Sequence, residues 1–225
     1  MLENDFEEKT NGMPLKILII GDTCVGKTNI MTRFANNVFK EHTLATICMN
    51  FGSRKLALEK NKLVCFHIWD TAGQEKYFSL PKIFFEGANG CFLVYDITNE
   101  ISFNNLDTWF NNIKNLCKEN ISIILVGNKC DLESQRKITK ELGISKAKKL
   151  ECPFFETSAK DNINIEEIFR KMGENIYKIL GDKIIIKKLK LQTNITKPKK
   201  QIKEGINLIQ KGNDTDMKQY NYCFK

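Results

Sequence analysis

The sequence predicts an α/β domain built on a mostly parallel, six-stranded sheet with helices on both faces. Short apolar runs that fit buried strands, such as 15–20 and 90–95, alternate with segments of helical periodicity. The first of these runs leads directly into a glycine-rich turn and the start of a helix, which is the local order of an anion-binding βα unit. At 225 residues, the chain suits one such domain with tails.

The glycine-rich turn fits the phosphate-loop pattern G-x-x-x-x-G-K-[ST]. Gly21 and Gly26 would let successive backbone N–H groups approach phosphate oxygens closely. Lys27 would reach the terminal phosphates and assist catalysis, and the Thr28 hydroxyl would bind Mg²⁺. The alternative is an ordinary turn between a strand and a helix. The predicted nucleotide contacts in this loop are Gly21, Asp22, Thr23, Cys24, Val25, Gly26, Lys27 and Thr28.

The first half of the chain continues with a helix and a hairpin. The helix is predicted near 29–36 and leads into a polar connection. Two strand-like runs at 49–58 and 63–69 lie close enough in sequence to predict an antiparallel hairpin. A glycine-containing loop over 70–80 and a short helix ending at residue 85 follow.

The second half alternates three strands with three helices. The strands are predicted at 90–95, at 121–126 and from Pro153 onward. One helix is predicted over 139–150, and Asn164 with Glu167 forms a capping-box pattern at the start of the last helix. The apolar stripes of the other two helices are Phe103, Leu106, Phe110, Ile113 and Cys117 in the first, and Ile165, Ile168, Phe169, Met172, Ile176 and Ile179 in the last.

A second motif, Asn128-Lys129-Cys130-Asp131, follows the strand at 121–126 and therefore lies at the ligand-binding edge of the sheet. A carboxylate accepts two hydrogen bonds side by side, and guanine offers N1–H and N2–H on one edge whereas adenine does not. Asp131 is therefore suited to reading guanine. The alternative is a surface turn of common turn residues. Ser158-Ala159-Lys160, after the last strand, would bring backbone N–H groups to the base, with Ala159 at the guanine carbonyl.

The remaining chemistry lies between these two motifs. Asp70, at the end of a strand, suits a carboxylate that holds Mg²⁺ through water, and Thr46 offers a hydroxyl to the same ion. The Gly73 N–H can approach a γ-phosphate because no Cβ intervenes. Gln74 can orient the attacking water and is the principal candidate for catalysis.

These five stretches, in this order and spacing, resemble the Ras superfamily of small GTPases. Segments 93–98 and 154–162, and the tryptophan before Asp70, are similar to the Rab branch in particular. The resemblance covers residues 14–180 and implies a P-loop G domain with one antiparallel strand. It implies that the protein binds GTP or GDP with Mg²⁺, hydrolyses GTP slowly and acts as a membrane-associated switch in vesicle trafficking. The implied protein partners are a GTPase-activating protein, an exchange factor and effectors.

The resemblance also implies roles for aromatic residues. Phe39 would pack on the guanine ring, with Lys129 on the other side of the base. Phe51, Trp69 and Phe84 would form an aromatic triad that partners contact. The alternatives are core packing for Phe39 and hairpin packing for Phe51 and Trp69. The sequence departs from the usual Rab pattern on the partner-facing surface, which leaves effector identity open, at Cys48, Asn50, Pro81 and Glu86.

The net charge of +8 is concentrated at the C-terminus. Residues 183–225 hold 11 Lys and 3 acidic residues, whereas the rest of the chain balances at 24 basic and 24 acidic residues. We therefore predict a disordered arm at 1–13, a G domain at 14–180 and a basic tail at 181–225, and no binding to nucleic acid.

The tail favours reversible attachment to the cytosolic face of an endomembrane, because lysines are attracted to anionic lipid. Cys223 is the candidate for prenylation, although Cys-Phe-Lys is not a C-a-a-X ending. The alternative is an unmodified, solvated tail. The eight cysteines are scattered without C-x-x-C pairs, and no signal peptide is apparent, so we expect reduced thiols and a cytoplasmic location. We also expect a monomer.

Two other function classes compete with this interpretation. The first is a GTP-binding scaffold with negligible hydrolysis and no membrane anchor, which the presence of Gln74 and Thr46 disfavours. The second is a P-loop ATPase or kinase, which Asp131 disfavours because adenine lacks the matching pair of donors.

Overall fold

The computed structural model describes residues 12–41, 50–59, 62–71, 82, 85–117 and 121–195, with side chains as far as residue 180. The chain divides into two compact units, Met1–Ile179 and Leu180–Lys225. The first unit holds the sheet and the described residues of the predicted nucleotide site.

The strands are β1 (Met13–Ile20), β2 (Asn50–Leu58), β3 (Lys62–Asp70), β4 (Gly90–Asp96), β5 (Ser122–Asn128) and β6 (Phe154–Thr157). They form one six-stranded sheet in the order β2-β3-β1-β4-β5-β6. All neighbours pair in parallel except β2 and β3, which form the predicted antiparallel hairpin. The predicted fold class is confirmed.

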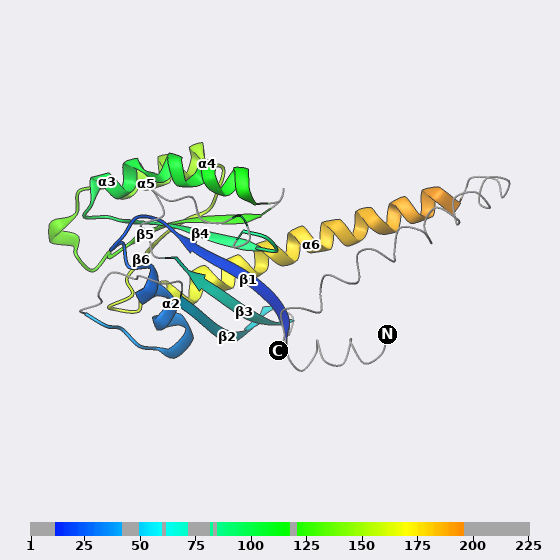
Figure 1. Cartoon of the computed structure of the whole chain (residues 1–225), viewed down its shortest axis with the longest axis horizontal. Coiled ribbons are helices and arrows are strands. Elements are labelled where there is room, and N and C mark those ends of the chain that lie inside the picture. The colour runs from blue at the N-terminus through cyan, green and yellow to red at the C-terminus, as the bar shows by residue number, and fades with distance from the viewer. Residues whose placement is uncertain are drawn as a thin grey trace. The chain divides into compact units, whose positions relative to one another are not determined.

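The helices of the described residues are α2 (Lys27–Asn36), α3 (Glu100–Asn104), α4 (Leu106–Leu116), η3 (Glu133–Gln135, a 3-10 turn), α5 (Lys140–Lys149) and α6 (Ile165–Ile195). Figure 1 shows α3, α4 and α5 on one face of the sheet and α2 with the beginning of α6 on the other. Because both faces are covered, every residue of β4 and β5 is buried, which explains why these strands are almost wholly apolar.

The two faces have different cores. On the α2 and α6 side, Phe34 stacks on Phe169 with ring centroids 3.7 Å apart, and Phe66 of β3 meets both rings edge-on. On the other side, the buried residues of α4 pack against alternate residues of β4. These cores fix the strand register, and with it the positions of the loops at the strand ends.

The structure corrects one predicted helix. The apolar stripe over 103–117 predicts a single helix, but the chain forms α3 and α4, which are separated at Asn105. The Asn99 side chain caps α3 by accepting hydrogen bonds from two N–H groups of its first turn. The predicted stripe residues Leu106 and Ile113 are buried as expected, and Trp109, which the stripe does not include, is buried beside them, whereas Phe110 is only partly buried. The buried residues of α4 are Leu106, Trp109 and Ile113.

Two element boundaries differ from the predicted ones. β1 begins at Met13, inside the predicted arm, and Met13 pairs with Val64 of β3. α6 continues through Ile195, inside the predicted tail, whereas its predicted apolar stripe ends at Ile179. The added stretch is rich in lysine, leucine and isoleucine and holds no glycine or proline after Gly181, so it has few helix-breaking residues. No helix in the described part of the chain is long and apolar enough to cross a membrane.

Candidate functional site

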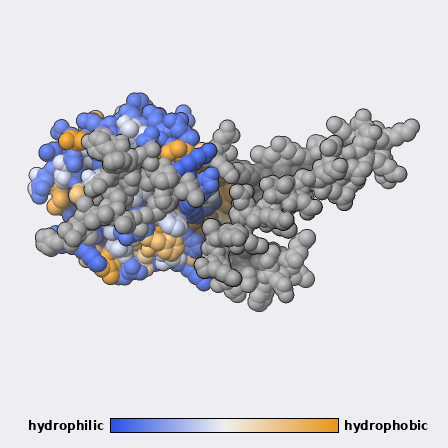
Figure 2. All heavy atoms as spheres, in the orientation of Figure 1, coloured by the Kyte–Doolittle hydropathy of each residue, from blue (hydrophilic) through white to orange (hydrophobic). Residues whose placement is uncertain are grey.

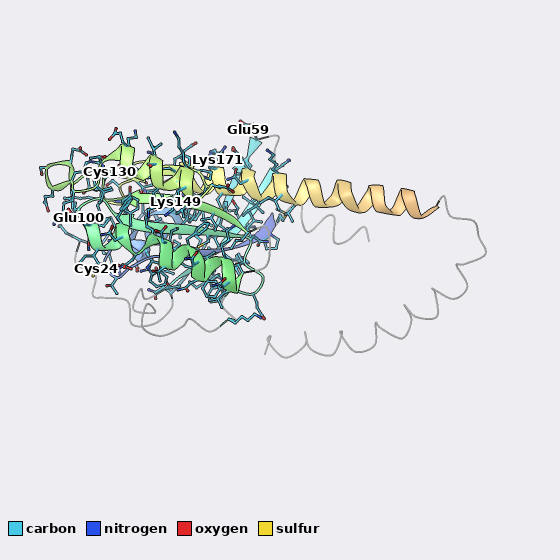
Figure 3. All side chains as sticks on the ribbon, turned by 90° about the horizontal axis from the view of Figure 1, so that it is seen from above. Cys24, Glu59, Glu100, Cys130, Lys149 and Lys171 are labelled. Atoms are coloured by element: carbon cyan, nitrogen blue, oxygen red, sulfur yellow. The ribbon has the colours of Figure 1, made fainter. Side chains whose placement is uncertain are left out.

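The predicted site residues lie where four strands end. The phosphate loop follows β1, Asp70 closes β3, Asn128 closes β5 and Ser158 follows β6. Because these strands are parallel to one another, their carboxyl ends meet at one edge of the sheet. Figure 3 labels Cys24 of the phosphate loop and Cys130 of the guanine motif at the same end of the domain.

The backbone of the phosphate loop requires glycine at two positions. Gly21 has φ 150°, and a Cβ there would lie 2.1 Å from the carbonyl oxygen of Val94. Gly26 has φ 94°, and a Cβ there would lie 2.3 Å from Asn128 Nδ2. Cys24 also has a positive φ of 63°, and its side chain is exposed. The loop therefore has a fixed, compact shape that brings its backbone close to both β4 and β5.

Lys27 and Thr28 begin α2 and are held by short bonds. Lys27 is buried, and its Nζ donates to the carbonyl oxygens of Gly21 and Asp22, each at 2.8 Å. Thr28 Oγ1 donates to Asp70 Oδ2 at 2.6 Å, and Asp70 is wholly buried. A hydroxyl and a carboxylate beside a phosphate loop are the oxygen donors that Mg²⁺ uses together with phosphate, so these residues fit the ion that the sequence predicts.

Asn128 connects the phosphate loop to the base-reading loops. Its Nδ2 donates to the carbonyl oxygen of Val25 at 2.8 Å, and its Oδ1 accepts from Thr157 Oγ1 at 3.0 Å. Asn128 and Thr157 are both buried. The Asn128 side chain thus connects the loop after β1 to the ends of β5 and β6 and sets the distance between them.

Asp131 and Ser158 face one another across the two base-reading loops. Ser158 Oγ donates to Asp131 Oδ1 at 2.6 Å and accepts from the N–H of Asp161 at 2.9 Å. The main chains are joined as well, because the Cys130 N–H donates to the Thr157 carbonyl at 3.0 Å. The Asp131 carboxylate is therefore held in one orientation by a hydroxyl from the neighbouring loop.

Lys129, the second residue of the Asn128–Asp131 motif, has a positive φ of 67°. Its Nζ forms an ion pair with Asp96 Oδ2 at 2.6 Å, where Asp96 is the buried last residue of β4. The ion pair directs the lysine stem along the base-reading end of the site. Lys160 forms a longer ion pair, 3.8 Å, with Glu41 beyond α2.

Two arginines that the sequence analysis does not identify brace the base-reading loops. Arg33 of α2 donates through Nε to the Ala159 carbonyl at 2.8 Å and through Nη2 to the Lys160 carbonyl at 3.0 Å. Arg136 grips both carboxylate oxygens of Glu156 at 2.7 and 3.1 Å. The hydrogen bonds to Glu156, and to a smaller extent those to Glu133, raise the pKa of Arg136. Both arginines act on the loops and not on the predicted ligand atoms.

The aromatic residues lie partly on the surface. Phe39 is half-buried and is not among the buried core residues, and its contact with a base stays a prediction. Phe51 is 54% exposed and meets the half-buried Trp69 at 5.2 Å between ring centroids, so the pair forms an outward aromatic face on β2 and β3. The view in Figure 2 is largely hydrophilic with separate apolar spots. Exposed large apolar side chains elsewhere are Val38, Ile101, Leu142, Ile144 and Ile163.

Several predicted site residues lie outside the described residues. They are Thr46, Gly73, Gln74, Phe84 and Cys223. Their roles stay predictions. The described part of the site consists of the phosphate loop, the Thr28–Asp70 pair and the two base-reading loops.

A sequence model described as the Ras family matches residues 16–178. The chain is 43% identical over 161 residues to the Ras-related protein Rab-3 of Caenorhabditis elegans, a match that covers 72% of this chain and 73% of the relative. It is 41% identical to the Ras-related protein Rab-10 of Diplobatis ommata, over 75% of this chain and 84% of the relative. It is 40% identical to the GTP-binding protein ypt2 of Schizosaccharomyces pombe, over 73% and 82%.

Proposed function

Because this chain belongs to the Ras family, we propose that the site described above binds GTP and GDP with Mg²⁺ and that hydrolysis switches the protein between two surface states. It is a Rab-like small GTPase, a GTP-hydrolysing enzyme that acts in vesicle trafficking. The observation that carries the proposal for this pocket is the joining of the phosphate loop to the Asp131–Ser158 pair through Asn128.

Guanine recognition is assigned to the base-reading loops. Asp131, oriented by Ser158, would accept hydrogen bonds from N1–H and N2–H of guanine. Ala159 and Lys160, whose carbonyls are held by Arg33, would present backbone N–H groups to the guanine carbonyl. Adenine in this place would leave a carboxylate facing a ring nitrogen without a proton, which costs binding energy. Phe39 and Lys129 would cover the two faces of the base.

Phosphate binding is assigned to the loop 21–28. Its N–H groups and the start of α2 favour negative charge, and Lys27 supplies a positive charge beside the carbonyls that hold it. Thr28, Asp70 and Thr46 would hold Mg²⁺, which when bound neutralises developing charge on the transferred phosphoryl group.

Hydrolysis is assigned to a water molecule oriented by Gln74. The attack releases inorganic phosphate and leaves GDP, and contacts of the γ-phosphate with Thr46 and Gly73 are then lost, so both flanking segments can relax. The sequence holds no arginine in the loop 21–28 or near Thr46. We therefore expect slow intrinsic hydrolysis that a GTPase-activating protein accelerates by orders of magnitude.

Gln74→Leu tests this assignment. The variant should keep its affinity for GTP, because leucine removes no contact to the base or the phosphates. It should lower single-turnover hydrolysis at least tenfold, measured with purified full-length chain, because the water loses its orienting group. Gln135→Leu, the same change at an exposed residue of η3, is the matched control and should hydrolyse GTP at the normal rate. Equal, measurable rates in all three proteins would exclude Gln74 from catalysis, and negligible hydrolysis by all three, the unmodified chain included, would favour the scaffold alternative.

The partner-facing and membrane-facing parts are proposed from the surface and the tail. Phe51 and Trp69, with Phe84, would contact effectors and regulators in the GTP state. Residues 183–203 carry eight lysines and no acid, which suits an anionic membrane surface on the cytosolic side. One prenyl chain on Cys223 together with this basic patch would give reversible anchoring. The mass of the C-terminal peptide from native protein should include a prenyl group, and an unmodified thiol would refute the anchor.

A further inference from the structure

The second residue of the phosphate loop makes contacts that nucleotide binding does not explain. Both carboxylate oxygens of Asp22 accept hydrogen bonds from side chains at the α3–α4 junction and in α4. Oδ1 accepts from the indole Nε1 of Trp109 at 2.7 Å, and Oδ2 accepts from Asn105 Nδ2 at 2.5 Å. The donors are neutral and the acceptor is charged, and such bonds are shorter and stronger than those between neutral groups.

The junction between α3 and α4 is arranged around this carboxylate. Asn105 occupies the N-cap of α4, a position where an asparagine side chain usually accepts from the helix N–H groups, yet it makes no cap hydrogen bond. It donates to Asp22 instead. Trp109 is one helical turn further on, which brings its buried indole to the same side of the helix. The side chain of Asn105 is thus used to hold the phosphate loop and not to cap its own helix.

The main chain of Asp22 holds Lys27. The Asp22 carbonyl accepts from Lys27 Nζ at 2.8 Å. One residue therefore positions the lysine through its backbone and attaches the loop to α4 through its side chain. A displacement of the Asp22 backbone would therefore disturb both contacts together.

A carboxylate in this loop also has an electrostatic consequence. Its charge has the same sign as a nucleotide's phosphates, and repulsion grows with the number of phosphate charges. Two donors, Asn105 at the junction of α3 and α4 and Trp109 of α4, hold the Asp22 carboxylate toward these helices.

We propose that Asp22 is a positioning residue whose carboxylate is clamped by Asn105 and Trp109, so that the phosphate loop and Lys27 are set for the phosphates while the carboxylate charge is turned from them. The inference rests on the proposed function, because it concerns the same nucleotide site. It makes α4 a part of the phosphate-binding apparatus, although that helix carries none of the sequence motifs.

The test measures release of GDP and of a non-hydrolysable GTP analogue from the full-length chain with Mg²⁺. Trp109→Phe keeps an aromatic ring in the core and removes the N–H donor, and Asn105→Ala removes the other donor. Each variant should release both nucleotides faster, and the GTP analogue about fivefold more so than GDP, because the freed carboxylate repels the extra phosphate charge. High salt should reduce this difference.

Two further variants make the test specific. Adding Asp22→Asn to Trp109→Phe removes the charge and should return the ratio of the two release rates to that of the unmodified chain, although both rates stay raised. Asp107→Asn, on the same helix but paired with Lys146 on α5, should leave both rates unchanged. Equal acceleration of GDP and analogue by Trp109→Phe, or a ratio that Asp22→Asn does not restore, would overturn the inference. An unmodified chain that binds no guanine nucleotide would instead remove the proposed function.

Discussion

The two ends of the pocket are held in shape by different means. At the base-reading end, side chains from several loops form hydrogen bonds with one another, and three of the residues that do so, Asn128, Thr157 and Ser158, are buried. At the phosphate end, Asp22 and Lys27 also make side-chain hydrogen bonds, but the loop additionally has positive φ at Gly21, Cys24 and Gly26. Both ends therefore use side-chain hydrogen bonds, and the phosphate end depends in addition on two positions where a Cβ does not fit.

The two ends meet at Asn128. Its Nδ2 bonds the Val25 carbonyl and leaves no room for a Cβ on Gly26, so the spacing between the ends is set by one amide group. Movement of the phosphate loop and movement of the base-reading loops are coupled at this point. Substitutions at either end should reveal the difference in how each is built.

Adding a Cβ at the phosphate end should have the largest effect. Gly21→Ala places a methyl group 2.1 Å from the backbone oxygen of Val94, inside the sheet, where neither partner can give way. We expect a loss of more than about 4 kcal/mol in the free energy of unfolding, or failure to fold, measured by urea denaturation. Gly87→Ala is the matched control, because Gly87 also has a positive φ but no atom within 4 Å of the added Cβ. A similar loss in both variants would mean that φ alone, and not the contact with β4, requires glycine at residue 21.

Changing a side chain at the base-reading end should alter specificity and leave the fold intact. Asp131→Asn puts an amide where guanine presents two donors, so GDP affinity should fall about 100-fold, and xanthosine diphosphate, which offers an acceptor at that edge, should gain affinity. Isothermal calorimetry with both nucleotides measures the change. Asp161→Asn on the adjoining loop should bind GDP normally, because its contact with Ser158 is made by the backbone. Unaltered GDP binding by Asp131→Asn would refute base reading by this carboxylate.

Much of this organisation follows from short-range signals in the sequence. The apolar runs predict all six strands, and the phosphate-loop and guanine motifs each lie within a few residues at a strand end, so their positions follow from the parallel sheet. The break between α3 and α4 at Asn105 is harder to predict. The Asn105 side chain donates to the distant Asp22 and does not cap α4, and no local pattern reports that contact.

The contacts that brace the site are not visible in the sequence. Arg33 and Ala159 are 126 residues apart, and Asp22 and Trp109 are 87 apart. No local pattern reports such a pair, because each depends on how helices on opposite faces pack onto the sheet. In the sequence alone, Arg33 is one more charged residue of a helix, and Trp109 is one more apolar residue.

The smallest predicted effect concerns two cysteines, one at each end of the pocket. Cys24 is exposed and has φ 63°, a conformation that costs about 1 kcal/mol for a residue with a Cβ. Cys24→Gly should therefore raise the free energy of unfolding by up to about 1 kcal/mol.

Cys130 has no positive φ, and it is half-buried against the core beside β5. Burial, with Glu156 and Asp131, raises the pKa of its thiol and keeps it neutral at pH 7. Cys130→Gly removes that packing, and it relieves no backbone strain because φ at residue 130 is not positive. It should therefore lower the free energy of unfolding by about 1 kcal/mol. Urea denaturation of both variants, without nucleotide, checks the signs. If both substitutions changed the free energy of unfolding in the same direction, the two ends would not differ in this respect, because glycine is expected to stabilise only the position with positive φ.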